Sequence, residues 1–156
     1  MTFISIDPSL SDSGYAVWEN GEVIEYGHIE ALLSDVRFVY QIFLDNEIDV
    51  AVIETQFIQP GRVQGGMQTI QARATWEALA RLEGLSIVEV PPSTWQSFCG
   101  LSKGLRGIKA PARRKRIKDG SIALAERAGI VTDNDNIADA VNIGRYYLYV
   151  EGTKTN

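Results

Sequence analysis

The sequence predicts an α/β fold with a five-stranded mixed sheet flanked by helices, and three observations lead to this prediction. First, three short strands open the chain, and Asn20-Gly21 between the second and third is a strong signal for an antiparallel hairpin. Second, residues 49–53 form a nearly continuous apolar run, typical of a strand buried on both faces, and residues 85–90 indicate another buried strand. Third, helical patterns alternate with these later strands, which favours parallel pairing through right-handed crossovers.

Each element follows from local signals in the chain. The first strand ends at Asp7 because Pro8 cannot donate to a continuing ladder. The apolar strand that follows the first helix ends in Glu54, and the last strand is closed by Pro91-Pro92. Periodic apolar residues then predict helices at about 31–46, 67–83, 112–128 and 135–150, with a short one around Trp95.

Length and composition favour one compact domain. The 156 residues with 45% hydrophobic content suit a single core, so we expect one domain over 1–156 with a mobile basic loop at about 100–112. No apolar stretch predicts a membrane span and no secretory signal is evident, so we expect the cytoplasm of a bacterial or phage-infected cell. Cys99 and His28 are the sole cysteine and histidine, which disfavours a disulfide or a thiolate or histidine metal site.

Charge is distributed unevenly along the chain. Eight of the 15 basic residues fall between positions 103 and 118 with no acid among them, and without those eight the net charge of −5 becomes −13. This asymmetry indicates a polyanionic partner such as nucleic acid. The alternative is an ordinary solvated helix face. The eight residues are Lys103, Arg106, Lys109, Arg113, Arg114, Lys115, Arg116 and Lys118.

Acidic residues mark a candidate metal site. Asp7 and Glu54 end two strands predicted to be parallel, and such sheets bind ligands at their carboxyl ends. Asp135 and Asp139 share one helix face at i, i+4, and Asn136 with Asp139 is the i, i+3 alternative. Converging carboxylates repel unless cations neutralise them, and hard oxygen ligands favour Mg²⁺ or Mn²⁺. Two such ions would support hydrolysis of a phosphodiester.

Each acid also has a structural interpretation on its own. Asp7 would cap the following turn, Glu54 would be a surface residue at a strand end, and Asp135 would complement its helix N-terminus. Their joint occurrence favours the metal site.

Several segments, taken in order, resemble the motifs of RuvC-type Holliday junction resolvases over nearly the whole chain. The resemblance implies a ribonuclease H-like fold, and a homodimer through the helix at about 67–83. It also implies a structure-selective endonuclease that makes paired symmetric nicks in four-way DNA junctions with Mg²⁺ or Mn²⁺. The compact form is more similar to bacteriophage versions. The segments are Ile6-Asp7-Pro8-Ser9, Gly14-Tyr15-Ala16-Val17, Ala51-Val52-Ile53-Glu54, Gln71-Ala72-Arg73 and Ala138-Asp139-Ala140.

The resemblance also assigns the metal ligands. Asp7, Glu54 and Asp139 match the family's metal-binding acids. The family has an acid or histidine three residues before the last Asp, where this sequence has Asn136, so the fourth ligand is Asp135, with Asn136 as the alternative. We count the four acids, Asp7, Glu54, Asp135 and Asp139, as catalytic.

Further residues are expected to contact DNA. Lys118 matches a family lysine near the scissile phosphate and is counted with the catalytic residues, and Phe57 matches an aromatic that stacks on junction bases. Arg62 is a candidate for a backbone phosphate. The alternatives are plain exposure for the two basic residues and core packing for Phe57. The remaining phosphate-binding candidates are Lys103, Arg106, Lys109, Arg113, Arg114 and Lys115.

Two other functions are compatible with the same residues. The first is a non-cleaving architectural protein that binds branched DNA, which the neutral Asn136 keeps open. The second is another ribonuclease H-like nuclease that acts on hybrids or flaps, because a fold does not fix a function. No glycine motif for a nucleotide occurs, so no small-molecule cofactor is expected.

Overall fold

A computed structural model describes residues 1–55 and 63–154, and a mixed sheet of order β3-β2-β1-β4-β5 forms its centre. β1 pairs antiparallel with β2 and parallel with β4, while β5 pairs parallel with β4. This confirms the predicted α/β fold, with three strands joined by antiparallel pairing and two further strands added in parallel. The strands are β1 (Thr2–Asp7), β2 (Ser13–Glu19), β3 (Glu22–Ile29), β4 (Val50–Glu54) and β5 (Ser86–Val90).

The hairpin between β2 and β3 has the predicted two-residue turn. Asn20 and Gly21 both have positive φ angles, 52° and 89°. These are the left-handed conformations that a tight turn with two positive φ angles requires, and Asn-Gly adopts them at low cost. The turn therefore sets the register in which β3 lies beside β2.

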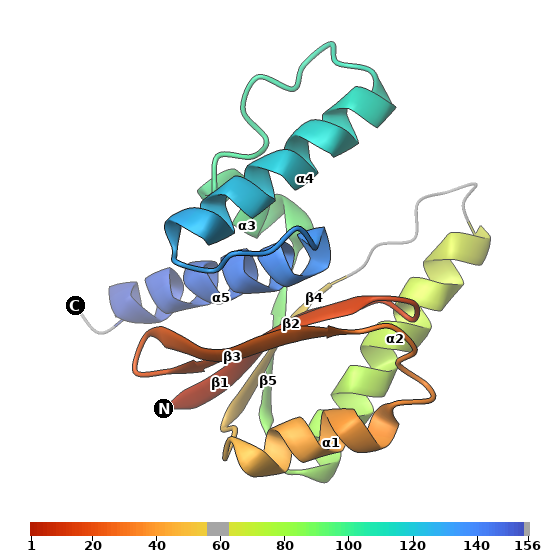
Figure 1. Cartoon of the computed structure of the whole chain (residues 1–156), viewed down its shortest axis with the longest axis vertical. Helices are drawn as coiled ribbons and strands as arrows, with labels where there is room; N and C mark the ends of the chain where they lie inside the picture. Colours follow the sequence, from red (N-terminus) through yellow and green to blue (C-terminus); the bar gives the residue numbers. More distant parts are fainter. Residues whose placement is uncertain (56–62, 155–156) are drawn as a thin grey trace.

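Helices cover both faces of the sheet (Figure 1). α1 and α2 lie on one face, α5 lies across the other, and α3 and α4 pack outside α5. Within the described part of the chain, no helix combines the length and the apolar content needed to cross a bilayer. The helices are α1 (Val36–Asp45), α2 (Val63–Leu82), α3 (Pro92–Phe98), α4 (Ala110–Arg127) and α5 (Asp135–Lys154).

Several helix boundaries differ from the prediction: α2 begins at Val63, about four residues early, and α5 continues to Lys154. Two further differences have local reasons. α1 begins at Val36 and not near residue 31, because Ser34 and Asp35 donate backbone hydrogen bonds to Ala31 in a preceding turn. α4 begins two residues early, at Ala110, because Pro111 is favourable in the first turn of a helix. The basic segment expected as a loop up to residue 112 is therefore helical from 110 onward.

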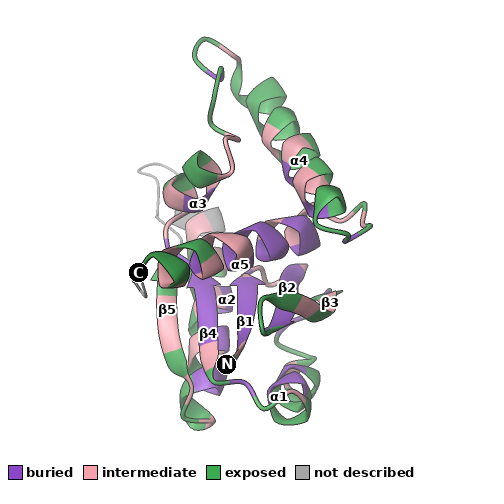
Figure 2. Ribbon diagram, turned by 90° about the vertical axis from the view of Figure 1, so that its left-hand side faces the viewer, coloured by how far each residue is buried: buried purple, intermediate pink, exposed green. Residues whose placement is uncertain are grey.

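Alternation along the central strands separates two apolar cores. Ile4 and Ile6 pack with the core beneath α1 and α2, whereas Phe3 packs with the core beneath α5. In β4, Ile53 belongs to the first core and Val52 to the second. Figure 2 shows the central strands buried between these layers. Because side chains alternate with period two, the residues that end β1 and β4 point toward α5.

Helix α5 lies unusually close to the sheet at two glycines. A Cβ atom at Gly14 would lie 1.9 Å from the carbonyl oxygen of Asn136, and one at Gly144 would lie 2.3 Å from Nε1 of Trp18. The absence of a side chain at both positions lets the helix backbone approach the strands. Trp18 is itself fixed, since its Nε1 donates a hydrogen bond of 2.8 Å to Oγ of Ser5.

Candidate active site

The ends of β1 and β4 bring two carboxyl groups together. Asp7 and Glu54 each follow a residue of the parallel pair Ile6–Ile53, and their side chains share a hydrogen bond. Burial raises the pKa of Asp7 well above its usual value, and the negative charge of Glu54 raises it further. The carboxyl of Glu54 is also held by Trp95, whose Nε1 donates a hydrogen bond of 2.7 Å to Oε1 of Glu54.

Helix α5 adds Asp135 and Asp139 to this pair. Gly14 is the partner of Asp7 in the β1–β2 register, and the first turn of α5 lies against Gly14. The charges of Asp139 and Asp135 both contribute to the raised pKa of Asp7, so the four acids form one electrostatic cluster. We call Asp7, Glu54, Asp135 and Asp139 the acidic cluster.

Asp139 is supported from helix α4. Burial raises its pKa to about 7, a hydrogen bond from Ser121 lowers it, and the charge of Asp135 raises it. The Ser121 hydroxyl donates to Oδ1 of Asp139 and in turn accepts a 2.9 Å hydrogen bond from Nδ2 of Asn142. Ser121 and Asn142 are both fully buried, so this chain of contacts fixes the orientation of the Asp139 carboxyl.

Lys118 lies at the edge of the acidic cluster. Its Nζ forms an ion pair with Oδ2 of Asp135, and its side chain stays 57% exposed. The hydrogen bond to Asp135 is the main cause of its raised pKa, with smaller contributions from the charges of Asp139 and Asp7. The structure therefore brings this sequence-predicted lysine beside the predicted acids, with its ammonium accessible to a ligand.

The two candidates for the fourth ligand have different neighbours. Asp135 lies within the acidic cluster, as its effect on the pKa of Asp7 shows. The side-chain amide of Asn136 donates to Oδ2 of Asp12 at 2.8 Å. The side chain of Asn136 is thus hydrogen-bonded to the β1–β2 loop.

The chemistry of the acidic cluster fits a divalent cation, although its carboxyl groups do not converge on one point. Within residues 1–55 and 63–154, no three Asp, Glu, His or Cys side chains are arranged to hold a metal ion together. The carboxyls are hydrogen-bonded to Ser121, Trp95, Lys118 and one another. Their mutual repulsion adds to the effect of burial in raising the pKa of Asp7, and hard divalent cations relieve such repulsion.

An exposed basic segment adjoins the cluster. We call the loop before α4 and the first half of α4, residues 103–118, the basic arm, and all eight of its Lys and Arg residues are exposed. Figure 2 shows much of this segment in the colour of exposed residues. It lies on the side of α5 away from the sheet (Figure 1). Lys103 and Arg116 line a groove between the loop and α4, and Lys115 pairs with Asp119 at 2.6 Å. Lys118 ends the arm at the acidic cluster.

Two predicted DNA contacts lie outside the described residues. Phe57 and Arg62 both fall within 56–62, so their roles stay predictions.

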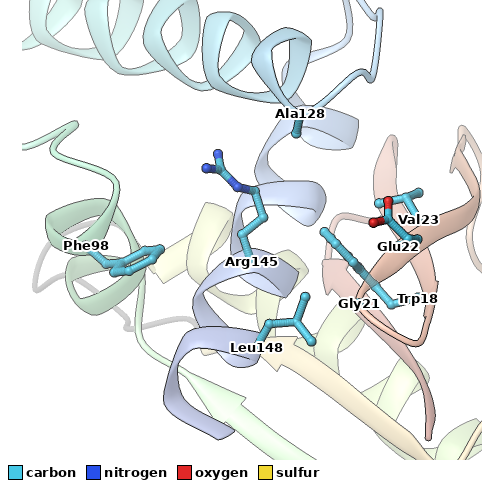
Figure 3. A pocket seen from close by; sticks show the side chains of 8 residues that line it. All are labelled: Trp18, Gly21, Glu22, Val23, Phe98, Ala128, Arg145 and Leu148. Atoms are coloured by element: carbon cyan, nitrogen blue, oxygen red, sulfur yellow. The ribbon is translucent and has the colours of Figure 1, made fainter. Parts of the chain in front are cut away.

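A separate hollow lies away from the acids, between the β2–β3 hairpin, α3 and α5 (Figure 3). Its volume is about 350 Å³, and none of the acidic cluster lines it. Arg145 reaches into it between Phe98 and Ala128, and its Nη1 donates to Oδ1 of Asn142 at 3.3 Å. The hollow is thus connected through Arg145 to Asn142, which helps to hold Asp139, but it is not part of the site.

Sequence reasoning missed four residues that support the site: Trp95, Ser121, Asn142 and Asp12. Ser121 follows Lys118 by one helical turn, and Asn142 follows Asp139 by the same spacing, so a shared face was the available signal. Asp12 had only the signature of a turn residue. Trp95 had only the signature of an apolar core residue.

No protein-family model and no curated protein sequence matches this chain. Solved structures do match it. RuvC of T. thermophilus in complex with a Holliday junction substrate has a TM-score of 0.70 at 12% identity, with 96% of each chain covered. The Holliday junction resolvase of fowlpox virus has a TM-score of 0.62 at 16% identity, covering 96% of this chain and 99% of that one.

The yeast mitochondrial Holliday junction resolvase Ydc2 has a TM-score of 0.57 at 13% identity, covering 93% of this chain and 78% of that one. Identities this low define a fold and nothing finer. This chain has the ribonuclease H-like fold of the RuvC-type resolvases.

Proposed function

We propose that this chain is a metal-dependent endonuclease that resolves four-way DNA junctions by paired symmetric nicks. The observation that carries the proposal is the meeting of the acidic cluster with the basic arm at Lys118. A phosphodiester bound by the arm lies next to carboxylates that suit Mg²⁺ or Mn²⁺. The fold shared with proteins described as Holliday junction resolvases supports the same substrate.

The acidic cluster would hold the metal ions, two per site. When bound, such ions activate the attacking water and stabilise the leaving oxygen. Trp95 and Ser121 orient the carboxyls of Glu54 and Asp139 through their hydrogen bonds. Lys118 can exchange its contact with Asp135 for a phosphate oxygen, because it is exposed and its ammonium is a point charge on a flexible stem.

The basic arm would bind the phosphate backbone. Its Lys and Arg side chains are exposed, so they are placed to contact phosphates, and such contacts position DNA and supply affinity without carrying sequence information. Phe57 stacking on a junction base and Arg62 contacting the backbone belong to the proposal on the strength of the sequence alone.

A homodimer through α2 completes the proposal. The buried face of α2, including Ala72 and Trp76, packs on the sheet. The opposite face leaves a row of small and apolar side chains exposed, which a second copy of α2 could cover. A two-fold pairing would supply two active sites for two opposed strands. The row consists of Met67, Ile70, Ala74, Ala78 and Leu82.

The test is to incubate the protein with a synthetic four-way junction, a plain duplex and an RNA/DNA hybrid, with Mg²⁺, Mn²⁺ or EDTA. Symmetric paired nicks on the junction, abolished by EDTA, are the expected result. Tight junction binding without any cutting would support the architectural protein and overturn the proposal. Preferred cleavage of the hybrid would support a different ribonuclease H-like nuclease.

A further inference from the structure

Asp12 lies at the centre of a hydrogen-bond network that reaches the first turn of α5. Its Oδ2 accepts from Nδ2 of Asn136 at 2.8 Å and from Nδ2 of Asn134 at 3.1 Å. Its Oδ1 lies 2.6 Å from Nδ1 of His28 on β3. The carboxylate therefore connects the β1–β2 loop, the edge strand and the start of α5.

Asn134, one of the two amides that Asp12 accepts from, caps the start of α5. Oδ1 of Asn134 accepts hydrogen bonds from the backbone N–H groups of Asn136 at 2.8 Å and Ile137 at 3.2 Å. These are the free donors at a helix N-terminus, so Asn134 acts as the N-cap. Asp12 accepts a hydrogen bond from Nδ2 of the same side-chain amide and therefore fixes the orientation of the N-cap residue Asn134.

The fixed turn is the one that carries the acids. Asp135 directly follows the cap, and Asp139 is one turn further along. The backbone of this turn also lies on Gly14, the neighbour of Asp7 across the β1–β2 pair. The amide contacts and the glycine contact both hold the backbone of this turn, which carries Asp135 and Asp139 beside Asp7 and Glu54.

We infer that Asp12 is a positioning residue that holds Asp135 and Asp139 against Asp7 and Glu54 and thereby raises the affinity for divalent cations. This inference rests on the proposed function, since it concerns the same acidic cluster. Hydrogen bonds to an ionised carboxylate are stronger than neutral ones, so one carboxylate can hold two amides. Outer residues that orient metal ligands change metal affinity by roughly 10–100-fold when they are removed.

The experiment measures Mn²⁺ binding to the DNA-free chain by calorimetry for the wild type, Asp12→Ala and Asp45→Ala. Asp45 is the matched control, because its exposed carboxylate also accepts from an amide, that of Gln41 at 2.6 Å, but lies on α1. We expect about tenfold weaker binding for Asp12→Ala and no change for Asp45→Ala. Junction cutting by Asp12→Ala should recover as Mn²⁺ is raised to saturation.

A double variant separates positioning from loss of folding. If Asp12 acts through the cap residue Asn134, then Asp12→Ala/Asn134→Ala should lose no more Mn²⁺ affinity than the larger single loss. Asp12→Asn serves as a second variant, since it keeps the shape of the side chain and should weaken Mn²⁺ binding in the same direction. Circular dichroism of each variant in EDTA records whether the fold is retained.

The outcomes distinguish this inference from the proposed function. Wild-type Mn²⁺ binding with unchanged affinity in Asp12→Ala and Asp12→Asn overturns the inference and leaves the nuclease proposal standing. Strictly additive losses of affinity in the double variant also overturn it. A wild type that neither binds Mn²⁺ nor cuts junctions removes the proposed function and the inference together.

Discussion

Asp7 lies directly opposite Gly14 in the antiparallel pair of β1 and β2, and α5 reaches the acidic cluster through the space that Gly14 leaves open. A side chain at position 14 would meet the carbonyl of Asn136 at 1.9 Å. The position of the helix acids relative to Asp7 thus depends on a backbone contact.

Gly14→Ala should therefore separate α5 from the strand ends. Because backbone cannot move aside as a flexible side chain can, we expect a destabilisation of at least about 1–3 kcal/mol and loss of Mn²⁺ binding. Urea unfolding and calorimetry measure the two effects. Gly152→Ala is the control, since a Cβ there meets no atom within 4 Å, and it should leave both unchanged or slightly raise stability. Equal behaviour of the two variants would contradict this interpretation of Gly14.

Asp7→Asn should abolish junction cutting while sparing junction binding. The substitution removes a carboxylate from the acidic cluster but leaves the basic arm intact. Gel-shift titration in EDTA and a nicking assay in Mg²⁺ report the two properties separately. Persistent cutting at a rate close to that of the wild type would remove Asp7 from the site.

Asp139 should make the metal-free chain less stable as the pH rises. Its folded pKa of about 7 lies above the usual value of 3.8, so its contribution to stability is fully present below about pH 4 and disappears as the pH rises through 7. Asp139→Asn carries no such charge. In EDTA the Tm of Asp139→Asn should therefore exceed the Tm of the wild type by more at pH 8 than at pH 5.

The size of this pH effect is on the order of a few kcal/mol at most, since one pKa unit corresponds to about 1.4 kcal/mol and solvent screens part of it. Asp119→Asn is the control, because this exposed carboxylate pairs with Lys115 on the surface. Mn²⁺ should raise the Tm of the wild type but not of Asp139→Asn. A pH-independent difference in Tm would show that the charge of Asp139 is not the cause.

Neutralising the basic arm should weaken DNA binding and flatten its dependence on salt. Removing one phosphate contact reduces the slope of log K against log salt by about 0.9 for duplex DNA. The double variant Arg113→Ala/Arg114→Ala, at two exposed positions of α4, should therefore bind junctions more weakly with a shallower slope. Arg37→Ala on α1 is the matched control. An unchanged slope would exclude these two arginines as phosphate ligands.

Ala74→Glu should prevent dimerisation if α2 is the interface. The side chain is exposed in the middle of the apolar row, where two copies of a new carboxylate would be buried without partners. Analytical ultracentrifugation should record a monomer, and paired nicking should fall relative to single nicking. Leu44→Glu introduces the same charge at an exposed apolar site on α1 and should leave the assembly unchanged.

The sheet could be predicted because its signals are local. Asn20-Gly21 fixes a hairpin, and the apolar run before Glu54 identifies a strand buried on both faces. Strand alternation then places Asp7 and Glu54 on the same side without any knowledge of the helices. The carboxylates at the strand ends were therefore within reach of sequence reasoning.

The residues that hydrogen-bond the acids or their helix could not be predicted from the sequence, because their contacts depend on how the helices pack. The hydrogen bond of Ser121 with Asp139 joins residues 18 positions apart, and that of Asp12 with Asn136 joins residues 124 apart. Neither distance nor orientation follows from spacing within one element. Helix starts were also missed where a preceding turn or a proline decided them, as at Val36 and Ala110.

Helix α5 contacts β2 closely at two points, where Asn136 lies against Gly14 and where Gly144 lies against Trp18. These two points are separated by more than one turn along the helix. Two fixed points define the direction of a rod, so α5 can neither tilt nor rise without leaving one of them. The spacing between the sheet acids and the helix acids is accordingly built into the main chain, which keeps the span available to a cation constant.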